Sequence, residues 1–143
     1  MNQARDVLDR LTNTAIEQHD LDGAMSLYAE DAVVMTPDAG VLHGRDEITA
    51  YWHDLMDAFP DGHYEHISRM EADGKAVDEG YFEGTNTVEM KTPTGETIPA
   101  TGKRVKLRSC DIATVKDGMI TEHHLYFDEG EFMRQLGLTP PPS

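Results

Sequence analysis

The main change in the spacing of apolar residues lies near residue 62, and it constrains the fold more than any other feature. Before it, apolar side chains recur at helical spacing in a segment about 3–19, in a short segment after Asp22 and in a segment about 44–59. After it, four long segments have strand character, at about 63–72, 76–90, 101–116 and 119–127. Helices followed by antiparallel strands predict an α+β fold.

Shorter elements complete the expected order. Asp22 is the expected N-cap of the second helix, which leads into a strand at Ala32–Met35, and the residues 37–40 form a turn. Further turns are expected at Asp73-Gly74, at 93–95 and at Asp117-Gly118. The chain should end in a short amphipathic helix containing Phe132, Met133 and Leu136, followed by three prolines at 140–142.

Length and charge limit the classes of function. A chain of 143 residues suits one domain, here expected to span 1–143. Twelve Lys plus Arg against 27 Asp plus Glu give a net charge of −15, which disfavours nucleic acid and anionic membranes as partners. No signal peptide or membrane span is expected, and Cys110 is the only cysteine, so we expect a cytoplasmic protein.

The last hairpin carries the most specific prediction. A two-residue turn at Asp117-Gly118 pairs Lys116 with Met119, and counting back from that pair places Asp111 opposite His124. One face of the hairpin is then apolar with ionisable groups set into it. Its members are Val105, Leu107, Ser109, Asp111, Ala113 and Val115 on one strand, with Ile120, Glu122, His124, Tyr126 and Asp128 on the other.

Asp111 and His124 are the leading candidates for acid/base chemistry. A carboxylate across from an imidazole can orient it and balance its charge during proton transfer at neutral pH. The same two residues could instead form a structural ion pair. Asp128 is a third candidate as an acid or base, although it could equally cap the final helix together with Glu131.

Other residues suggest a ligand site of apolar character, without a metal. Trp52 and Phe59 belong to an aromatic stripe on the third helix that either lines a pocket or packs in the core. Adjacent His123 and His124 project to opposite faces of a strand, so no metal site is expected. Gly80 and Gly84 lack the strand-turn-helix context of a phosphate-binding loop.

The order of several motifs resembles that of the SnoaL-like polyketide cyclases, members of the nuclear transport factor 2-like superfamily. The resemblance covers nearly the whole chain. The residues that carry it are Ala29-Glu30-Asp31-Ala32-Val33, Gly44-Arg45-Asp46, Phe59-Pro60-Asp61, Phe82-Glu83-Gly84-Thr85-Asn86-Thr87, Thr101-Gly102-Lys103, Asp117-Gly118-Met119-Ile120 and Gln135-Leu136-Gly137-Leu138. One departure is Asn86, which stands where the family commonly has a histidine and cannot shuttle a proton.

The resemblance implies a cone-shaped fold in which a strongly curved, mostly antiparallel sheet wraps around a pocket, capped by three N-terminal helices. Relatives close a polyketide ring by aldol condensation with no metal or other cofactor, and often form homodimers through the outer sheet face. Two other branches of the superfamily fit less well. The ketosteroid isomerases have an aspartate where Thr36 precedes Pro37 here, and the limonene epoxide hydrolases need a pocket arginine, whereas Arg108 falls on the outer face.

These observations predict a cofactor-independent lyase or isomerase that acts on a small hydrophobic or aromatic carbonyl compound. In this reading Asp111, His124 and Asp128 handle the proton, while Trp52, Asn86, Tyr126 and Phe59 contact the substrate. The alternative is a protein of the same fold that binds such a molecule without reacting.

Overall fold

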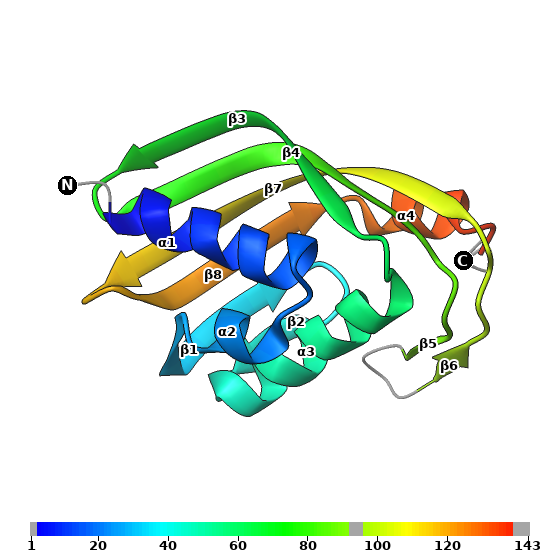
Figure 1. Ribbon diagram of the computed structural model, residues 1–143, viewed down its shortest axis with the longest axis horizontal. Helices are drawn as coiled ribbons and strands as arrows, with labels where there is room; N and C mark the ends of the chain where they lie inside the picture. Colours follow the sequence, from blue (N-terminus) through cyan, green and yellow to red (C-terminus); the bar gives the residue numbers. More distant parts are fainter. Residues whose placement is uncertain (1–2, 92–95, 139–143) are drawn as a thin grey trace.

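A six-stranded sheet curves around the N-terminal helices in the computed structural model, which describes residues 3–91 and 96–138 (Figure 1). Its strand order is β2-β1-β8-β7-β4-β3. The strands are β1 (Tyr28–Thr36), β2 (Gly40–His43), β3 (His63–Ala72), β4 (Lys75–Thr85), β7 (Arg104–Lys116) and β8 (Met119–Phe127). The short strands β5 (Met90–Lys91) and β6 (Thr97–Ile98) pair separately.

The sheet is mostly antiparallel, as predicted. Strands β3, β4, β7 and β8 form an antiparallel series, and β1 pairs antiparallel with β2 but parallel with β8. Helix α1 (Gln3–Thr12) crosses the concave face, α2 (Leu21–Met25) and α3 (Gly44–Ala58) close one side, and α4 (Glu129–Gln135) follows the last strand (Figure 1). The predicted α+β cone with three N-terminal helices is therefore confirmed.

Some local predictions differ from the structure. The first helix changes at Asn13 into a π-helical turn that ends at Glu17. The second helix is capped by Asp20, not Asp22, because the Asp20 carboxylate accepts a hydrogen bond from the Gly23 amide at 3.0 Å. Strands β2, β5 and β6 were not predicted, and the strand expected at about 76–90 ends at Thr85. The turn at 93–95 and the prolines at 140–142 lie outside the described residues.

Two apolar clusters fill the space between the helices and the sheet. The larger one joins α1, α2 and α3 to β1, β7 and β8, with Leu8, Ile48 and Ile120 fully buried. The smaller one lies where α3 and α4 meet β7 and includes Phe59 and Leu136. None of the helices in the described part of the chain is long and apolar enough to span a membrane.

At Gly80 on β4 the neighbouring strand β3 leaves no space for a side chain. A Cβ atom on Gly80 would lie 2.2 Å from the carbonyl oxygen of Glu65 and 2.8 Å from the Tyr64 ring. The pairing of β3 with β4 also shifts by one residue between His66 and Ser68, and such bulges increase strand bending. The close approach of β3 therefore explains why position 80 is a glycine, without any role in phosphate binding.

Gly80→Ala should lower the free energy of unfolding by about 1–3 kcal/mol, because the new methyl group overlaps backbone that cannot move aside cheaply. Urea unfolding followed by circular dichroism measures it. Gly130→Ala in α4 is the control, since its Cβ would meet only side-chain atoms, the nearest being Oδ1 of the capping Asp128 at 3.2 Å, and it should cost less stability than Gly80→Ala. Equal effects of the two substitutions would contradict this account.

Candidate active site

The pairing of β7 with β8 contains a bulge that the sequence prediction did not include. Lys116 pairs with Met119 and Val115 with Ile120, as expected from the turn, but Thr114 pairs with Glu122, so Thr121 is an extra residue. One extra residue reverses which side chains face inward beyond that point. The prediction that Asp111 lies opposite His124 is therefore wrong.

The bulge places His123 on the concave face and His124 on the outer face. His123 is buried, with 1% of its side chain exposed, and its Nε2 atom lies 2.6 Å from Oδ2 of Asp111. His124 pairs instead with Ile112, and its Nε2 atom lies 3.1 Å from Glu122. Tyr126, predicted to contact substrate, is 51% exposed on the same outer face.

His123 belongs to a chain of buried hydrogen bonds that residue spacing did not predict. Its Nδ1 atom lies 2.8 Å from the hydroxyl of Tyr28, a fully buried residue of β1. The indole nitrogen of Trp52 donates to the same hydroxyl at 3.1 Å. Three elements, α3, β1 and β8, thus fix the imidazole against Asp111 on β7.

The donors in this chain determine the tautomer of His123. Burial raises the pKa of Tyr28 far above its usual value, so its hydroxyl keeps its proton. Because Trp52 can only donate, the Tyr28 proton is free to go to Nδ1 of His123. The imidazole proton then lies on Nε2 and is donated to the side-chain oxygen of Asp111.

Asp111 and His123 line an inner cavity of about 100 Å³ between the helices and the sheet. Trp52, Tyr64 and Ser109 line it too, and the Tyr64 hydroxyl lies 3.5 Å from that of Ser109. The Asp111 side chain is 19% exposed. Among residues 3–91 and 96–138, His123 is its only hydrogen-bond partner, which leaves carboxylate capacity for a ligand.

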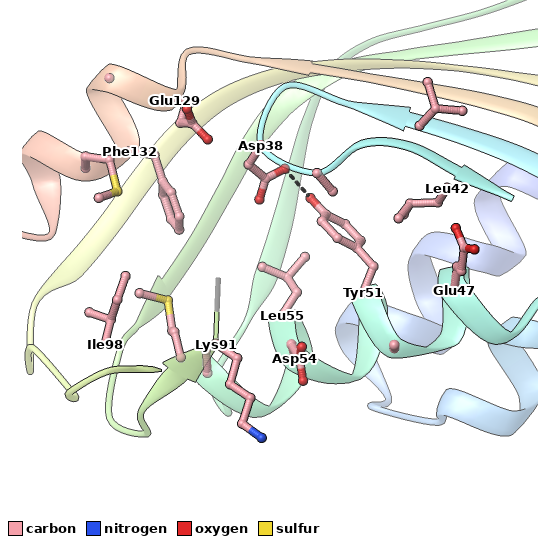
Figure 2. Close-up of a pocket in the computed structure, with 17 residues that line it drawn as sticks. Asp38, Leu42, Glu47, Tyr51, Asp54, Leu55, Lys91, Ile98, Glu129 and Phe132 are labelled. Carbon is pink, nitrogen blue, oxygen red and sulfur yellow. Dashed lines mark hydrogen bonds between the residues drawn. The ribbon is translucent and has the colours of Figure 1, made fainter. Parts of the chain in front are cut away.

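A larger outer cavity of about 670 Å³ lies between α3, α4, β5, β6 and the turn that joins β1 to β2. Figure 2 shows Asp38 reaching from that turn to the Tyr51 hydroxyl, which donates to it at 3.1 Å. Asp38, Leu55 and Phe132 line both cavities, so the two adjoin at these residues. The wall of the outer cavity is mainly apolar, with charged groups toward its rim.

The other predicted site residues have structural partners. Asp128 caps α4, since its carboxylate accepts from the Glu131 amide at 3.1 Å. The Asn86 side chain is fully buried and bonds to Ala58, Val88 and Thr101. Phe59 is 1% exposed and packs against the rings of Phe82 and Phe132.

A second carboxylate on the concave face, Asp78, lies with His66 and Asp9 in a group whose ligand-type atoms are within 4.8 Å of one another. Metal binding there conflicts with two arginines. Arg5 contacts both carboxylates, at 2.5 Å to Asp78 and 2.6 Å to Asp9, and Arg69 donates to Nδ1 of His66. A histidine that binds a metal through one nitrogen normally donates from the other, which Arg69 prevents.

The helices packed over a curved sheet form a nuclear transport factor 2-like cone, which is a likeness of fold alone. Solved structures of low identity share the fold. A protein described as a SnoaL-like polyketide cyclase from Jannaschia sp. CCS1 superposes with a TM-score of 0.83 at 16% identity, over 98% of this chain and 94% of that one. A protein of ketosteroid isomerase-like fold from Catenulispora acidiphila, crystallised with trimethylamine, gives 0.74 at 12%, over 94% and 93%.

IdmH from Streptomyces antibioticus, described as a polyketide cyclase, gives a TM-score of 0.76 at 24% identity, over 94% of this chain and 99% of that one. A search of curated protein sequences finds no significant match. The model of the SnoaL-like domain matches residues 8–123. The chain therefore belongs to the SnoaL-like family.

Tyr28→Phe should lower the free energy of unfolding by about 1–3 kcal/mol, because it leaves the Trp52 indole and His123 Nδ1 buried without a partner. Chemical unfolding measures this loss. Tyr126→Phe is the control, because that hydroxyl is exposed and makes only a 3.5 Å contact with His124. A Tyr28→Phe protein as stable as the Tyr126→Phe protein would show that the buried chain is not formed.

Proposed function

We propose that this protein is a cofactor-independent acid/base enzyme that acts on a small carbonyl compound, by aldol cyclisation or a related proton transfer. The observation that carries the proposal is the Asp111 carboxylate, oriented by a buried imidazole and open to a cavity. A base with a fixed orientation and remaining acceptor capacity is what proton removal beside a carbonyl requires. Family membership supports a cyclase-like or isomerase-like role.

Asp111 is the proposed base, and His123 orients it. Asp111 takes a proton from the carbon next to the substrate carbonyl, and the resulting enolate oxygen needs a hydrogen-bond donor. Tyr64 can supply that bond, because it lines the same cavity and burial raises the pKa of its hydroxyl, which therefore stays protonated. In an aldol closure the enolate carbon bonds to a second carbonyl carbon, and Asp111 returns its proton to that carbonyl's oxygen.

The two cavities suggest how a substrate would lie. The inner cavity of about 100 Å³ has room only for the reacting end of a molecule, while the outer one of about 670 Å³ suits an apolar or aromatic body. Trp52 lines the inner cavity and stays among the residues we expect to contact substrate. Leu55 and Phe132 replace Asn86, Tyr126 and Phe59 as the side chains we expect to contact substrate.

The proposal predicts exchange of the α-protons of a simple bicyclic ketone, 2-tetralone, for deuterium in D₂O, followed by proton NMR. Asp111→Asn should reduce the catalysed rate by about 100-fold or more, as expected for loss of a general base. His123→Gln should reduce it about 10-fold or more, through loss of orientation. Circular dichroism checks that each variant is folded.

His124→Gln is the matched control, since the same substitution one residue along alters only the outer face. It should leave the exchange rate unchanged. If His124→Gln abolished exchange and His123→Gln did not, His124 would be the histidine that assists the reaction, and the role proposed for His123 would be wrong. Full exchange by Asp111→Asn would overturn the proposed function.

Binding without reaction is the alternative function, and the cavity volumes favour it in one respect. Most of the available space lies in the outer cavity, whereas Asp111 and His123 line the smaller, inner one. In this alternative, 2-tetralone would shift amide signals around Leu55 and Tyr51, yet its α-protons would exchange no faster than in buffer. Faster exchange that depends on Asp111 would reject the alternative.

Two copies of the chain are proposed to associate through the outer face of the sheet, which exposes apolar side chains of β1, β3 and β8: Met35, Met70 and Tyr126. The same face carries both signs of charge, including the Arg108–Glu79 pair, as a self-complementary contact requires. A single domain over 1–143 and a cytoplasmic location stay predictions.

Light scattering coupled to size exclusion tests the dimer. It should give the mass of two chains, and Tyr126→Glu should reduce it to that of one, because a charge replaces apolar contact. Val88→Glu alters an exposed apolar residue outside this face and should leave the mass unchanged. A single-chain mass for the unmodified protein would contradict the dimer.

A further inference from the structure

Five neighbouring strands each place one polar side chain in a row across the concave face. From β1 to β3 the row is Tyr28, His123, Asp111, Asp78 and His66, on β1, β8, β7, β4 and β3. The proposed function uses the first three. Asp78 lies directly opposite Asp111 in the pairing of β4 with β7, and side chains in such positions are neighbours, with Cβ atoms about 4.5–5.5 Å apart.

Asp78 is a fully buried carboxylate with one strong partner. Its Oδ1 atom lies 2.5 Å from the guanidinium of Arg5, which α1 brings across the sheet. Its Oδ2 atom is buried without a hydrogen bond and lies 3.5 Å from Nε2 of His66, which is buried and unbonded as well. A buried carboxylate that is paired with an arginine but lacks one hydrogen bond lowers the stability of the fold.

The donors around Asp78 favour its ionised form. Arg69 donates to Nδ1 of His66 at 3.1 Å, so the proton of a neutral imidazole lies on Nε2, toward Asp78. Asp78 therefore faces two donors, Arg5 and the Nε2–H of His66, and acts as an acceptor. His66 thus faces Asp78 through Nε2, as His123 faces Asp111. The two aspartates are direct partners in the pairing of β4 with β7.

We propose that Asp78 is a positioning residue for the base, whose negative charge beside Asp111 sets the pH range in which Asp111 removes a proton. This inference rests on the proposed function. Two carboxylates side by side in a buried site repel, so each makes the other harder to ionise and more basic once ionised. The pKa of Asp78 is raised by its burial and by the charge of Asp111, and Arg5 offsets part of that shift.

The charged and titratable groups that face Asp78 and Asp111 come from five elements. Arg5 is the one permanently charged cation in direct contact with Asp78 among the described residues, and it is shared with Asp9, whose side chain is 37% exposed. The titratable groups around the two carboxylates are Arg5 and Asp9 on α1, Tyr28 on β1, Tyr64 and His66 on β3, Cys110 on β7 and His123 on β8.

The pH profile of the 2-tetralone exchange rate tests the inference. A base works only when ionised, so the rate falls as the pH drops through the titration of Asp111. Asp78→Asn removes a neighbouring negative charge, makes Asp111 easier to ionise, and should move this acid limb to lower pH by about 1 unit. Because a weaker base removes the proton more slowly, the plateau rate should also fall several-fold.

Asp9→Asn is the matched control, because Asp9 accepts from the same arginine but is partly exposed to solvent, which screens its charge. Its acid limb should stay in place. A loss of rate for Asp78→Asn with no movement of the acid limb would reduce Asp78 to a structural role and overturn the inference. If Asp111→Asn retained full exchange, the proposed function itself would have failed, so the two failures are distinguishable.

A measurement on the unmodified protein covers the case in which Asp78→Asn does not fold. In a sample labelled with ¹³C at the aspartate carboxyl groups, the Asp78 and Asp111 signals should each show two steps on titration, because each carboxyl senses the other's proton. Independent single-step curves for the two carboxyls would overturn the inference without any substitution.

Discussion

One buried imidazole, that of His123, links helix α3 and strands β1, β7 and β8 through its hydrogen bonds. His123 has two ring nitrogens and almost no access to water, so each needs a partner within the protein. Tyr28 and Asp111 meet that need from different strands, and Trp52 fixes Tyr28 from α3. The layer of helices and the sheet are thereby joined by polar contacts as well as by apolar packing.

Sequence patterns predicted the architecture because most of them depend on local spacing. The helix-to-strand change near residue 62 and the turn at Asp117-Gly118 appear as expected, whereas the strand expected at about 76–90 ends at Thr85 and the one expected at 101–116 begins at Arg104. The site needed the exact register, and one extra residue at Thr121 reversed the prediction for β8. A signal was available: Leu125 and Phe127 share a face with His123, and a bulge turns these apolar residues inward, where burial favours them.

Other parts of the site had no local signal. Tyr28 lies almost a hundred positions from His123 in the sequence, and only the parallel pairing of β1 with β8 brings them together. Asp78 is similarly one acidic residue among 27 until the β4–β7 register places it beside Asp111. Such contacts come from strand pairing over long distances along the chain, which residue spacing does not encode.

Arg5 ties the first helix to the chemistry of the sheet. Beside its ion pair with Asp78, its guanidinium donates to the backbone carbonyls of Met70 and Val77, so α1 is fastened to β3 and β4 at that point. Arg5 on α1 and Asp78 on β4 therefore depend on each other, and replacing Arg5 alone would leave the buried charge of Asp78 without its ion-pair partner. A chimera that took its N-terminal helix from another family member would have to take the partner of that arginine as well, or bury an unpaired charge next to the base.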